Sequence, residues 1–278
     1  MSVVNTNTGA MAARNALAIN NRNLSTAMEQ LSTGQRINSS ADDAAGAGIA
    51  NRMKAQIGSL NIAVRNANDG ISMLQTADAA TSQMTAMLMR MRELAIQSAN
   101  DTNSGDERTS LQVEFSGLQD QLDNIIGNTT WNGMKLLDGD AGTGTSVAFH
   151  VGAQSDDSIT LPLATMNSAD IATVIDTAST SIDTQANAET SLVLIDDAIT
   201  QIDGLRGDWG AMMNRLTYAA DNAANVSMHT AASHSRIMDA NYAQATADMA
   251  RAMILDQAGT AMLSQANQQP IYVLALLR

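Results

Sequence analysis

The sequence predicts a mainly α-helical fold: an elongated antiparallel helical bundle or coiled coil of paired N- and C-terminal helices, with a small β-hairpin region in the middle. Two long segments carry apolar residues at heptad-like spacing, one in each half of the 278-residue chain. Turn residues and clear strand patterns are confined to the middle. Because one amphipathic helix cannot bury its own apolar stripe, the two distant segments are each other's most economical partners.

The first helix is predicted over residues 8–32. Leu17, Leu24 and Leu31 stand one heptad apart along it. Gly34 follows as a C-cap, because glycine readily adopts the left-handed conformation that ends many helices.

A second helix is predicted to follow the polar, turn-like segment 35–48 and to continue to about Ala99. Ser40, followed three residues later by Asp43, forms a capping-box pattern for its start. Apolar residues recur along this helix at spacings of three and four, so they share one face. These residues are Ile49, Met53, Ile57, Leu60, Val64, Ala67, Ile71 and Leu74.

Helical periodicity returns near Ala186 and persists to about Gln265, interrupted only by three glycines. Spacings of three and four recur, with Arg206 filling one turn. The apolar series comprises Ile195, Ile199, Ile202, Trp209, Met213, Leu216 and Ala220. We expect this face to pack on the apolar face of the second helix, and the two faces together are called the long-helix seam.

The middle of the chain contains a third helix and a short β region. The helix follows a turn at 100–106 and gives an antiparallel hairpin with the second helix. Asn132-Gly133 is a strong turn dipeptide, and the β region is expected at about 138–185. Two runs within it alternate as short strands, namely Val147, Phe149, Val151 and Ile159, Leu161, Leu163.

Composition excludes several kinds of partner. Aromatic residues make up 3% of the chain and methionine is abundant, with 18 residues, which suits closely packed helices. A net charge of −13 repels phosphate backbones and anionic membrane surfaces, so neither nucleic acid nor membrane is an expected partner. The sequence has no signal-peptide pattern. Residues alone would therefore indicate a cytosolic protein, although an export route that reads no cleaved signal would look the same.

The residues predict no catalytic, cofactor-binding or metal site, and hence no enzyme. Cysteine is absent. His229 and His234 are five residues apart, which turns them away from a shared ligand face on a helix. Helix capping explains Asp42 and Asp43 better than acid–base chemistry does, because no His, Lys or Cys lies near them in sequence.

Several long blocks resemble one protein family. They are LSTGQRINSSADDAAGAGIANRM (31–53), NANDGISMLQTAD (66–78), MRELAIQSANDTNS (91–104), SRIMDANYA (235–243), ILDQAGTAMLSQANQQP (254–270) and VLALL (273–277). In order and spacing they are similar to bacterial flagellin, over roughly residues 1–140 and 190–278. The resemblance implies a structural subunit that self-polymerises into the helical filament of the bacterial flagellum and serves motility.

The resemblance also implies a domain division. Residues 1–43 with 236–278 would form the inner layer of a filament and residues 44–235 the outer layer, without a large variable domain. Residues at both ends are expected to pack the filament core, namely Leu17, Leu24, Leu31, Leu274, Leu276 and Leu277. We expect these residues to carry assembly rather than folding of the single chain.

Partners and location follow from the same resemblance. They are further copies of the chain, the flagellar cap and hook-junction proteins, an export chaperone and the type III export apparatus, which delivers subunits outside the cell without a cleaved signal. The Toll-like receptor for flagellin is a further expected partner, with Arg90, Leu94 and Glu114 at the matching positions. The alternative is a hook–filament junction protein of the same family group. A hydrolase built from Asp and His residues would have little room in so short a middle.

Overall fold

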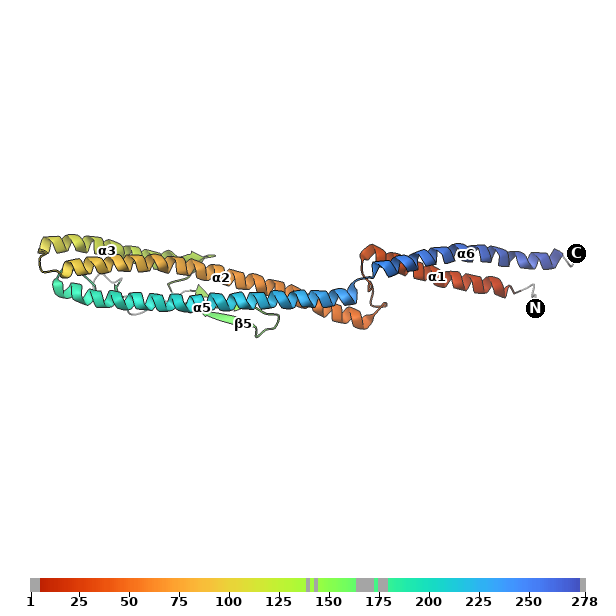
Figure 1. The fold of residues 1–278 in the computed structure, drawn as a ribbon, viewed down its shortest axis with the longest axis horizontal. Helices are drawn as coiled ribbons and strands as arrows, with labels where there is room; N and C mark the ends of the chain where they lie inside the picture. The colour runs from red at the N-terminus through yellow and green to blue at the C-terminus, as the bar shows by residue number, and fades with distance from the viewer. Residues whose placement is uncertain (1–5, 139–140, 143–144, 164–172, 175–179, 276–278) are drawn as a thin grey trace. The chain divides into compact units, whose positions relative to one another are not determined.

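The computed structural model describes residues 6–138, 141–142, 145–163, 173–174 and 180–275. They fall into two compact units, each described here by itself. The terminal unit comprises Met1–Ile57 and Met228–Arg278, and the central unit comprises Gly58–Ser227. Helices dominate both units (Figure 1), so the predicted mainly α fold with a small β region is confirmed.

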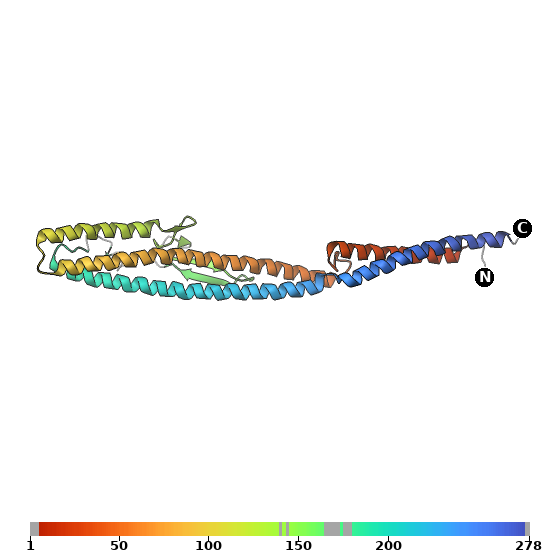
Figure 2. The ribbon, with the colours of Figure 1, turned by 45° about the horizontal axis from the view of Figure 1, so that its top comes forward.

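Helices α1 (Thr8–Thr33) and α6 (Tyr242–Ala275) lie side by side in the terminal unit (Figures 1 and 2). The Asn7 side chain accepts a hydrogen bond from the Ala10 amide at 3.0 Å and caps the start of α1. Gly34 ends α1 with a φ of 73° and donates its amide to the Gln30 carbonyl. The predicted glycine C-cap is confirmed.

The start of α2 (Ala44–Ala99) differs from the prediction. Asp43 stands immediately before the helix, and its Oδ1 accepts a hydrogen bond from the Gly46 amide at 2.8 Å. The predicted capping box, with Ser40 as the cap and Asp43 three residues inside the helix, is therefore wrong. Asp42 instead closes the preceding turn by accepting from the amides of Asn38 and Ser39, and these bonds lower the pKa of its carboxyl.

Helices α2, α3 (Gly105–Asn128) and α5 (Gln185–Met238) share the core of the central unit. A capping box joins Ser104 and Glu107 at the start of α3: the Ser104 hydroxyl accepts from the Glu107 amide, and the Glu107 carboxylate accepts from the Ser104 amide. Fully buried core side chains from the three helices include Met73, Leu74, Met84, Leu88, Phe115, Leu122, Ile195, Ile202, Trp209 and Leu216.

Two small sheets occupy the middle of the chain. Strands β1 (Thr130–Trp131) and β2 (Met134–Lys135) are antiparallel. Their connecting residues, Asn132 and Gly133, have φ values of 50° and 82°, as a tight hairpin turn requires. The turn predicted at this dipeptide is confirmed.

The second sheet has the order β3 (Ala141–Gly142), β4 (Thr145–His150), β5 (Ser158–Pro162). β4 and β5 pair antiparallel, with Val147 opposite Leu161, so the alternating runs are strands as predicted. Val151 and Leu163 lie just beyond the strand ends, and the parallel pairing of β3 with β4 was not predicted. Phe149 of β4 lies over Gly70 of α2, where a Cβ atom would approach its ring to 3.4 Å.

The C-terminal helical region contains a break that the periodicity did not predict. α5 ends at Met238, α6 begins at Tyr242, and residues 239–241 separate them. Asp239 forms an isolated bridge with Gln35, and the Ala240 amide donates to the Gly34 carbonyl at 2.9 Å. These contacts with the residues after α1 take the place of the backbone hydrogen bonds that would continue α5.

We predict that Leu74→Ala destabilises the central unit by about 2–5 kcal/mol, because the side chain is completely buried between helices and its loss leaves a cavity. Urea unfolding followed by circular dichroism measures the change. Val193→Ala, at a position 61% exposed on α5, is the control and should stay within about 0.5 kcal/mol of the parent. Equal effects of the two substitutions would contradict the assigned core.

Candidate assembly interface on the terminal helix pair

One face of α1 packs along α6. Ala10, Asn20 and Ala27 are buried on this face, whereas Leu17, Leu24 and Leu31 are half-buried. Together they recur at spacings of seven, three and four, which keeps them on one side of the helix. Leu17, Leu24 and Leu31 therefore contribute to pairing within the chain, and their predicted role in contacts between chains stays a prediction.

α6 meets this face with small residues. Ala245, Ala252, Gly259 and Ala266 stand seven residues apart, and Ala245 and Ala252 are each only 5% exposed. A Cβ atom at Gly259 would lie 2.9 Å from Cδ2 of Leu17, which is closer than side chains tolerate. Small residues at this spacing let the two backbones approach closely.

Two asparagines of α1 fix the register of the pair. The Asn20 amide group donates to the Ala252 carbonyl at 2.8 Å, and the Asn7 amide group donates to the Ala266 carbonyl at 2.7 Å. The Tyr242 hydroxyl donates to the Leu31 carbonyl at 2.8 Å at the other end. The residue numbers of these partners rise along α1 and fall along α6, so the two helices are antiparallel. A shift of one helix along the other would leave the buried Asn20 side chain without its hydrogen bond.

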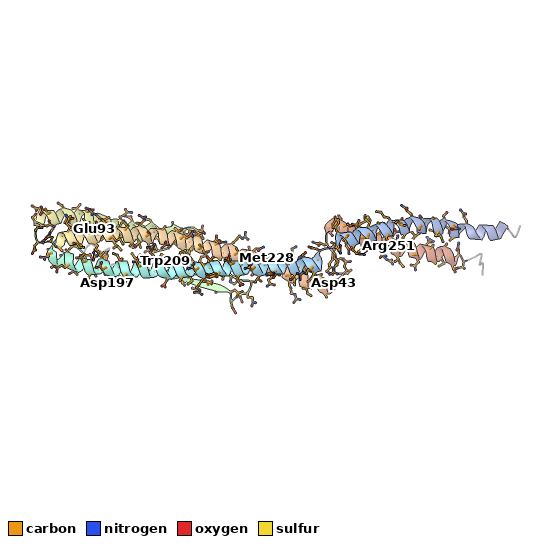
Figure 3. All side chains as sticks on the ribbon, in the orientation of Figure 1. Asp43, Glu93, Asp197, Trp209, Met228 and Arg251 are labelled. Carbon is orange, nitrogen blue, oxygen red and sulfur yellow. The ribbon has the colours of Figure 1, made fainter. Side chains whose placement is uncertain are left out.

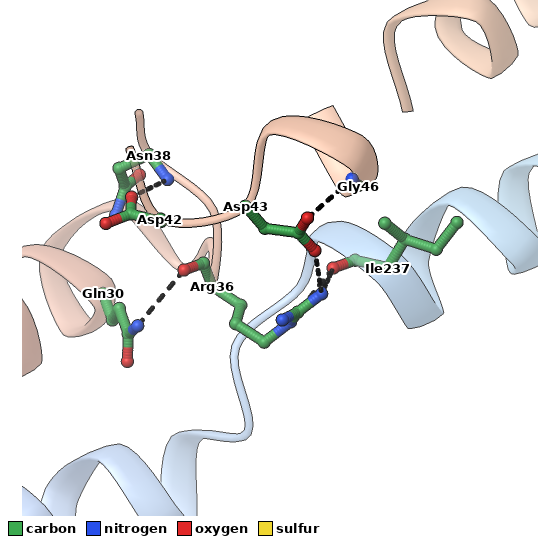
Figure 4. A network of polar contacts seen from close by, with 7 residues as sticks. All are labelled: Gln30, Arg36, Asn38, Asp42, Asp43, Gly46 and Ile237. Carbon is green, nitrogen blue, oxygen red and sulfur yellow. Dashed lines mark hydrogen bonds and ion pairs between the residues drawn. The ribbon is translucent and has the colours of Figure 1, made fainter. Parts of the chain in front are cut away.

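A polar network holds the turn between α1 and α2 against the end of α5 within the terminal unit (Figure 4). The Arg36 guanidinium donates to the Ile237 carbonyl from Nη2 at 2.8 Å and from Nε at 3.2 Å, and Nη2 lies 3.8 Å from the Asp43 carboxylate. Gln30 donates to the Arg36 carbonyl at 3.1 Å. Because the Arg36–Asp43 ion pair is exposed, its Coulomb attraction adds little, and the bonds to backbone carbonyls order the turn.

Side chains project from both helices of the pair (Figure 3), and several large apolar ones among them are exposed. Met253, Ile254 and Leu255 are consecutive and are 42%, 66% and 52% exposed. Since successive helical residues are turned by about 100°, these three point in different directions. The further exposed apolar residues of α1 and α6 are Met11, Ile19, Met28 and Met262. We call this set of seven the uncovered apolar surface.

Such a surface is unusual for a protein that works as a single chain. A helix that is apolar on several sides is normally buried, and contiguous exposed apolar patches mark contact sites. The side of α6 that packs on α1 includes Ala245, Ala252 and Gly259, and its more exposed sides have room for further helices. The terminal helix pair is therefore the candidate site for association with other copies.

Three C-terminal leucines are predicted to pack a filament core. The backbone of Leu274 is part of α6, whereas Leu276 and Leu277 lie outside the described residues. Their role stays a prediction. The sequence analysis did not identify the small residues of α6 or the uncovered apolar surface. The alanine or glycine at every seventh position, from Ala245 to Ala266, could have indicated the first of these.

The structure brings the central-unit part of the long-helix seam into one core. Leu74, Ile195, Ile202 and Leu216 are buried there, with half-buried Val64, Ile71, Ile199 and Met213 packed against them. Leu60 is also buried, and Met53 and Ile57, which belong to the terminal unit, are half-buried. Ile49 does not join them, being 39% exposed. Gly46 and Ala50 take the inward positions in that part of α2, and a Cβ atom on Gly46 would come within 2.8 Å of Ile37.

Ion pairs bridge α2 and α5 in the central unit. Arg206, which interrupts the apolar series, pairs with Asp78 at 2.8 Å, and this hydrogen bond raises the pKa of the guanidinium. Arg92 pairs with Asp196 at 2.6 Å. These partners explain why charged residues are tolerated at the edges of the seam.

The residues predicted to contact an innate receptor have different environments. Arg90 of α2 pairs with Glu114 of α3 at 2.9 Å, and both side chains are about half exposed at 49% and 48%. Leu94 is 1% exposed and belongs to the core. Its predicted direct contact is corrected accordingly, because a buried side chain presents no surface to a receptor.

Among the described residues, no group of three or more His, Asp or Glu side chains is placed to hold a metal ion. Within the same part of the chain, no helix is long and apolar enough to cross a membrane. Asp42 and Asp43, the adjacent carboxylates noted in the sequence, are engaged by backbone amides of the α1–α2 turn and the start of α2.

A three-helix core and a terminal helix pair with an uncovered apolar surface define a helical structural protein. Comparison with known families agrees: the bacterial flagellin N-terminal helical region matches residues 4–142, and the bacterial flagellin C-terminal helical region matches residues 192–277. The chain belongs to the bacterial flagellin family, whose members are structural proteins.

Individual relatives cover nearly the whole chain. It is 41% identical over 276 residues to the flagellin of Halalkalibacterium halodurans, covering 99% of this chain and 100% of that protein. It is 38% identical over 285 residues to the flagellar filament 33 kDa core protein of Treponema phagedenis, again covering 99% and 100%. The crystal structure of Bacillus cereus flagellin aligns with a TM-score of 0.51 and 35% identity, covering 57% of this chain and 88% of that chain.

We predict that Gly259→Leu loosens the terminal helix pair, because the added side chain would displace Leu17 and push α1 away from α6. Hydrogen exchange measured by mass spectrometry should show faster exchange of α1 and α6 amides, with α3 unchanged. Ala258→Leu, at the neighbouring exposed position, is the matched control. Unchanged exchange in Gly259→Leu would refute close packing at this position.

Proposed function

We propose that this chain is the repeating subunit of a bacterial flagellar filament and that its terminal helix pair carries self-polymerisation. The uncovered apolar surface is the observation that supports this most directly. Family membership supports this kind of assembly, and the exposed apolar residues of the helix pair support the surface proposed for it.

Polymerisation would complete a core that the single chain leaves open. Fully burying an exposed large apolar side chain contributes about 1.5–3 kcal/mol. The seven residues of the uncovered apolar surface are 42–66% exposed, so each would contribute roughly half of that when a neighbour covers it, and together they can drive association. Contacts between unlike faces of successive copies generate a helical filament when their rotation does not close into a ring. Ordering of the helix ends would accompany binding, as in other coupled folding and association reactions.

The domain division proposed for the filament assigns residues 1–43 with 236–278 to its inner layer and residues 44–235 to its outer layer. The breaks between α1 and α2 and between α5 and α6 lie close to these boundaries. The two compact units of the single chain meet at other positions, namely within α2 after Ile57 and within α5 after Ser227. The layer boundaries are thus a proposal about the assembled state.

The remaining partners are proposed from the family alone. The subunit would leave the cell through the type III export apparatus, with the help of an export chaperone and without a cleaved signal. It would then assemble outside the cell between the hook-junction proteins and the cap.

We predict that Ile254→Asp lowers seeded polymerisation at least about tenfold, because burying an unpaired carboxylate between copies costs more than about 1.4 kcal/mol. Sedimentation and electron microscopy after addition of short filament seeds measure the polymer formed. Gln121→Asp, which adds the same charge at an exposed site on α3, is the control and should polymerise normally. Normal polymerisation of Ile254→Asp would refute the assigned surface. Small capped assemblies of the parent chain would instead indicate the hook–filament junction alternative.

We predict that removing residues 270–278 leaves a soluble helical chain that does not polymerise, because the segment belongs to the proposed inner layer. Circular dichroism checks that the helices persist, and the seeded assay checks assembly. Long filaments from the truncated chain would rule out a role for the C-terminal leucines.

Recognition by the Toll-like receptor for flagellin is proposed through Arg90 and Glu114, which form an exposed pair across α2 and α3. We predict that the purified monomer activates a receptor reporter line and that Arg90→Ala reduces the response. Arg92→Ala is the matched control, because Arg92 pairs with Asp196 on α5. A silent parent chain, or an Arg90→Ala variant as active as the parent, would defeat the proposal.

A further inference from the structure

The terminal helix pair has four exposed methionine side chains among its described residues. Its exposed methionines are Met11, Met28, Met253 and Met262, at 63%, 45%, 42% and 60% exposure. We call these four the surface thioethers. In contrast, Met73, Met84 and Met91 are completely buried in the core of the central unit. Solvent-borne oxidants therefore reach the first group and not the second.

Exposure decides how methionine reacts with peroxides. The thioether sulfur attacks one oxygen of hydrogen peroxide, the O–O bond breaks, an S–O bond forms and water leaves. Sulfur loses two electrons and peroxide gains them, so the products are methionine sulfoxide and water. The side chain changes from a flexible apolar group to a polar hydrogen-bond acceptor.

This change would fall on the surface through which copies are proposed to meet. The other members of the uncovered apolar surface, Ile19, Ile254 and Leu255, are aliphatic and themselves offer no donor to a sulfoxide oxygen. Burying such an oxygen without a donor opposes association, whereas burying the parent thioether favours it. Each surface thioether thus contributes to assembly only in its reduced form.

We propose that the surface thioethers are a modification site at which peroxide oxidation blocks assembly of the free subunit. The inference rests on the proposed function, since it assumes that copies cover the uncovered apolar surface. It also implies a difference between two states. The free subunit is sensitive to peroxide, whereas the assembled subunit is protected because its neighbours exclude the oxidant from these sulfurs.

The test compares free subunits and preformed filaments treated with hydrogen peroxide. Peptide mass spectrometry locates the added oxygen atoms, and seeded sedimentation measures the concentration needed for polymerisation. We expect oxidation of the surface thioethers in the free subunit and a rise of about tenfold or more in that concentration. In filaments the same sulfurs should remain reduced. Methionine sulfoxide reductases should restore assembly of the treated subunit.

Two variants separate these sulfurs from other oxidation sites. Replacing all four surface thioethers by leucine keeps an apolar side chain of similar volume and should give polymerisation that peroxide does not inhibit. Met89→Leu, at a position 55% exposed on α2 of the central unit, should remain as sensitive as the parent.

Specific outcomes would overturn the proposal. They are full assembly of subunits oxidised at these sulfurs, equal oxidation of free and assembled subunits, or failure of enzymatic reduction to restore assembly. An untreated parent chain that does not polymerise would overturn the proposed function itself, which distinguishes the two failures.

Discussion

The close antiparallel approach of α1 and α6 is the constraint on which the terminal unit depends. Alanine and glycine at every seventh position of α6 leave room for Leu17 and its neighbours, while Asn7 and Asn20 bond to carbonyls that only one register brings opposite them. Small residues give the pair its narrow separation, but they bury little apolar area. Pairing therefore sets the separation and register of the two helices, and seven large apolar side chains on them remain exposed.

The central unit buries its apolar side chains in a different way. Three helices and a small sheet surround large side chains such as Phe115 and Trp209, so the core closes within one chain. Ion pairs at its margin, such as Arg206 with Asp78, cover the edges of the seam. We propose different tasks for the two units. The closed core would keep a subunit folded by itself, whereas the open helix pair would reach a complete core only by association with other copies.

Helix positions could be predicted from the sequence because their causes are local: apolar periodicity, the glycine after α1 and the Asn132-Gly133 turn. The errors have distant causes. Asp43 rather than Ser40 precedes α2, in a turn held by Arg36 and the end of α5. The break after Met238 contains neither glycine nor proline and is set by pairing with Gln35 and Gly34. Burial of Leu94 depends on helices packed around it, which a motif match does not convey.

Neighbouring copies are proposed to cover the sides of α6 that α1 leaves open. Electron cryomicroscopy of the assembled polymer at side-chain resolution tests it most directly. The account predicts that Met253, Ile254 and Leu255, which point in different directions from one helix, each contact another copy. A polymer in which these side chains face solvent, with copies joined through the central unit alone, would contradict the account.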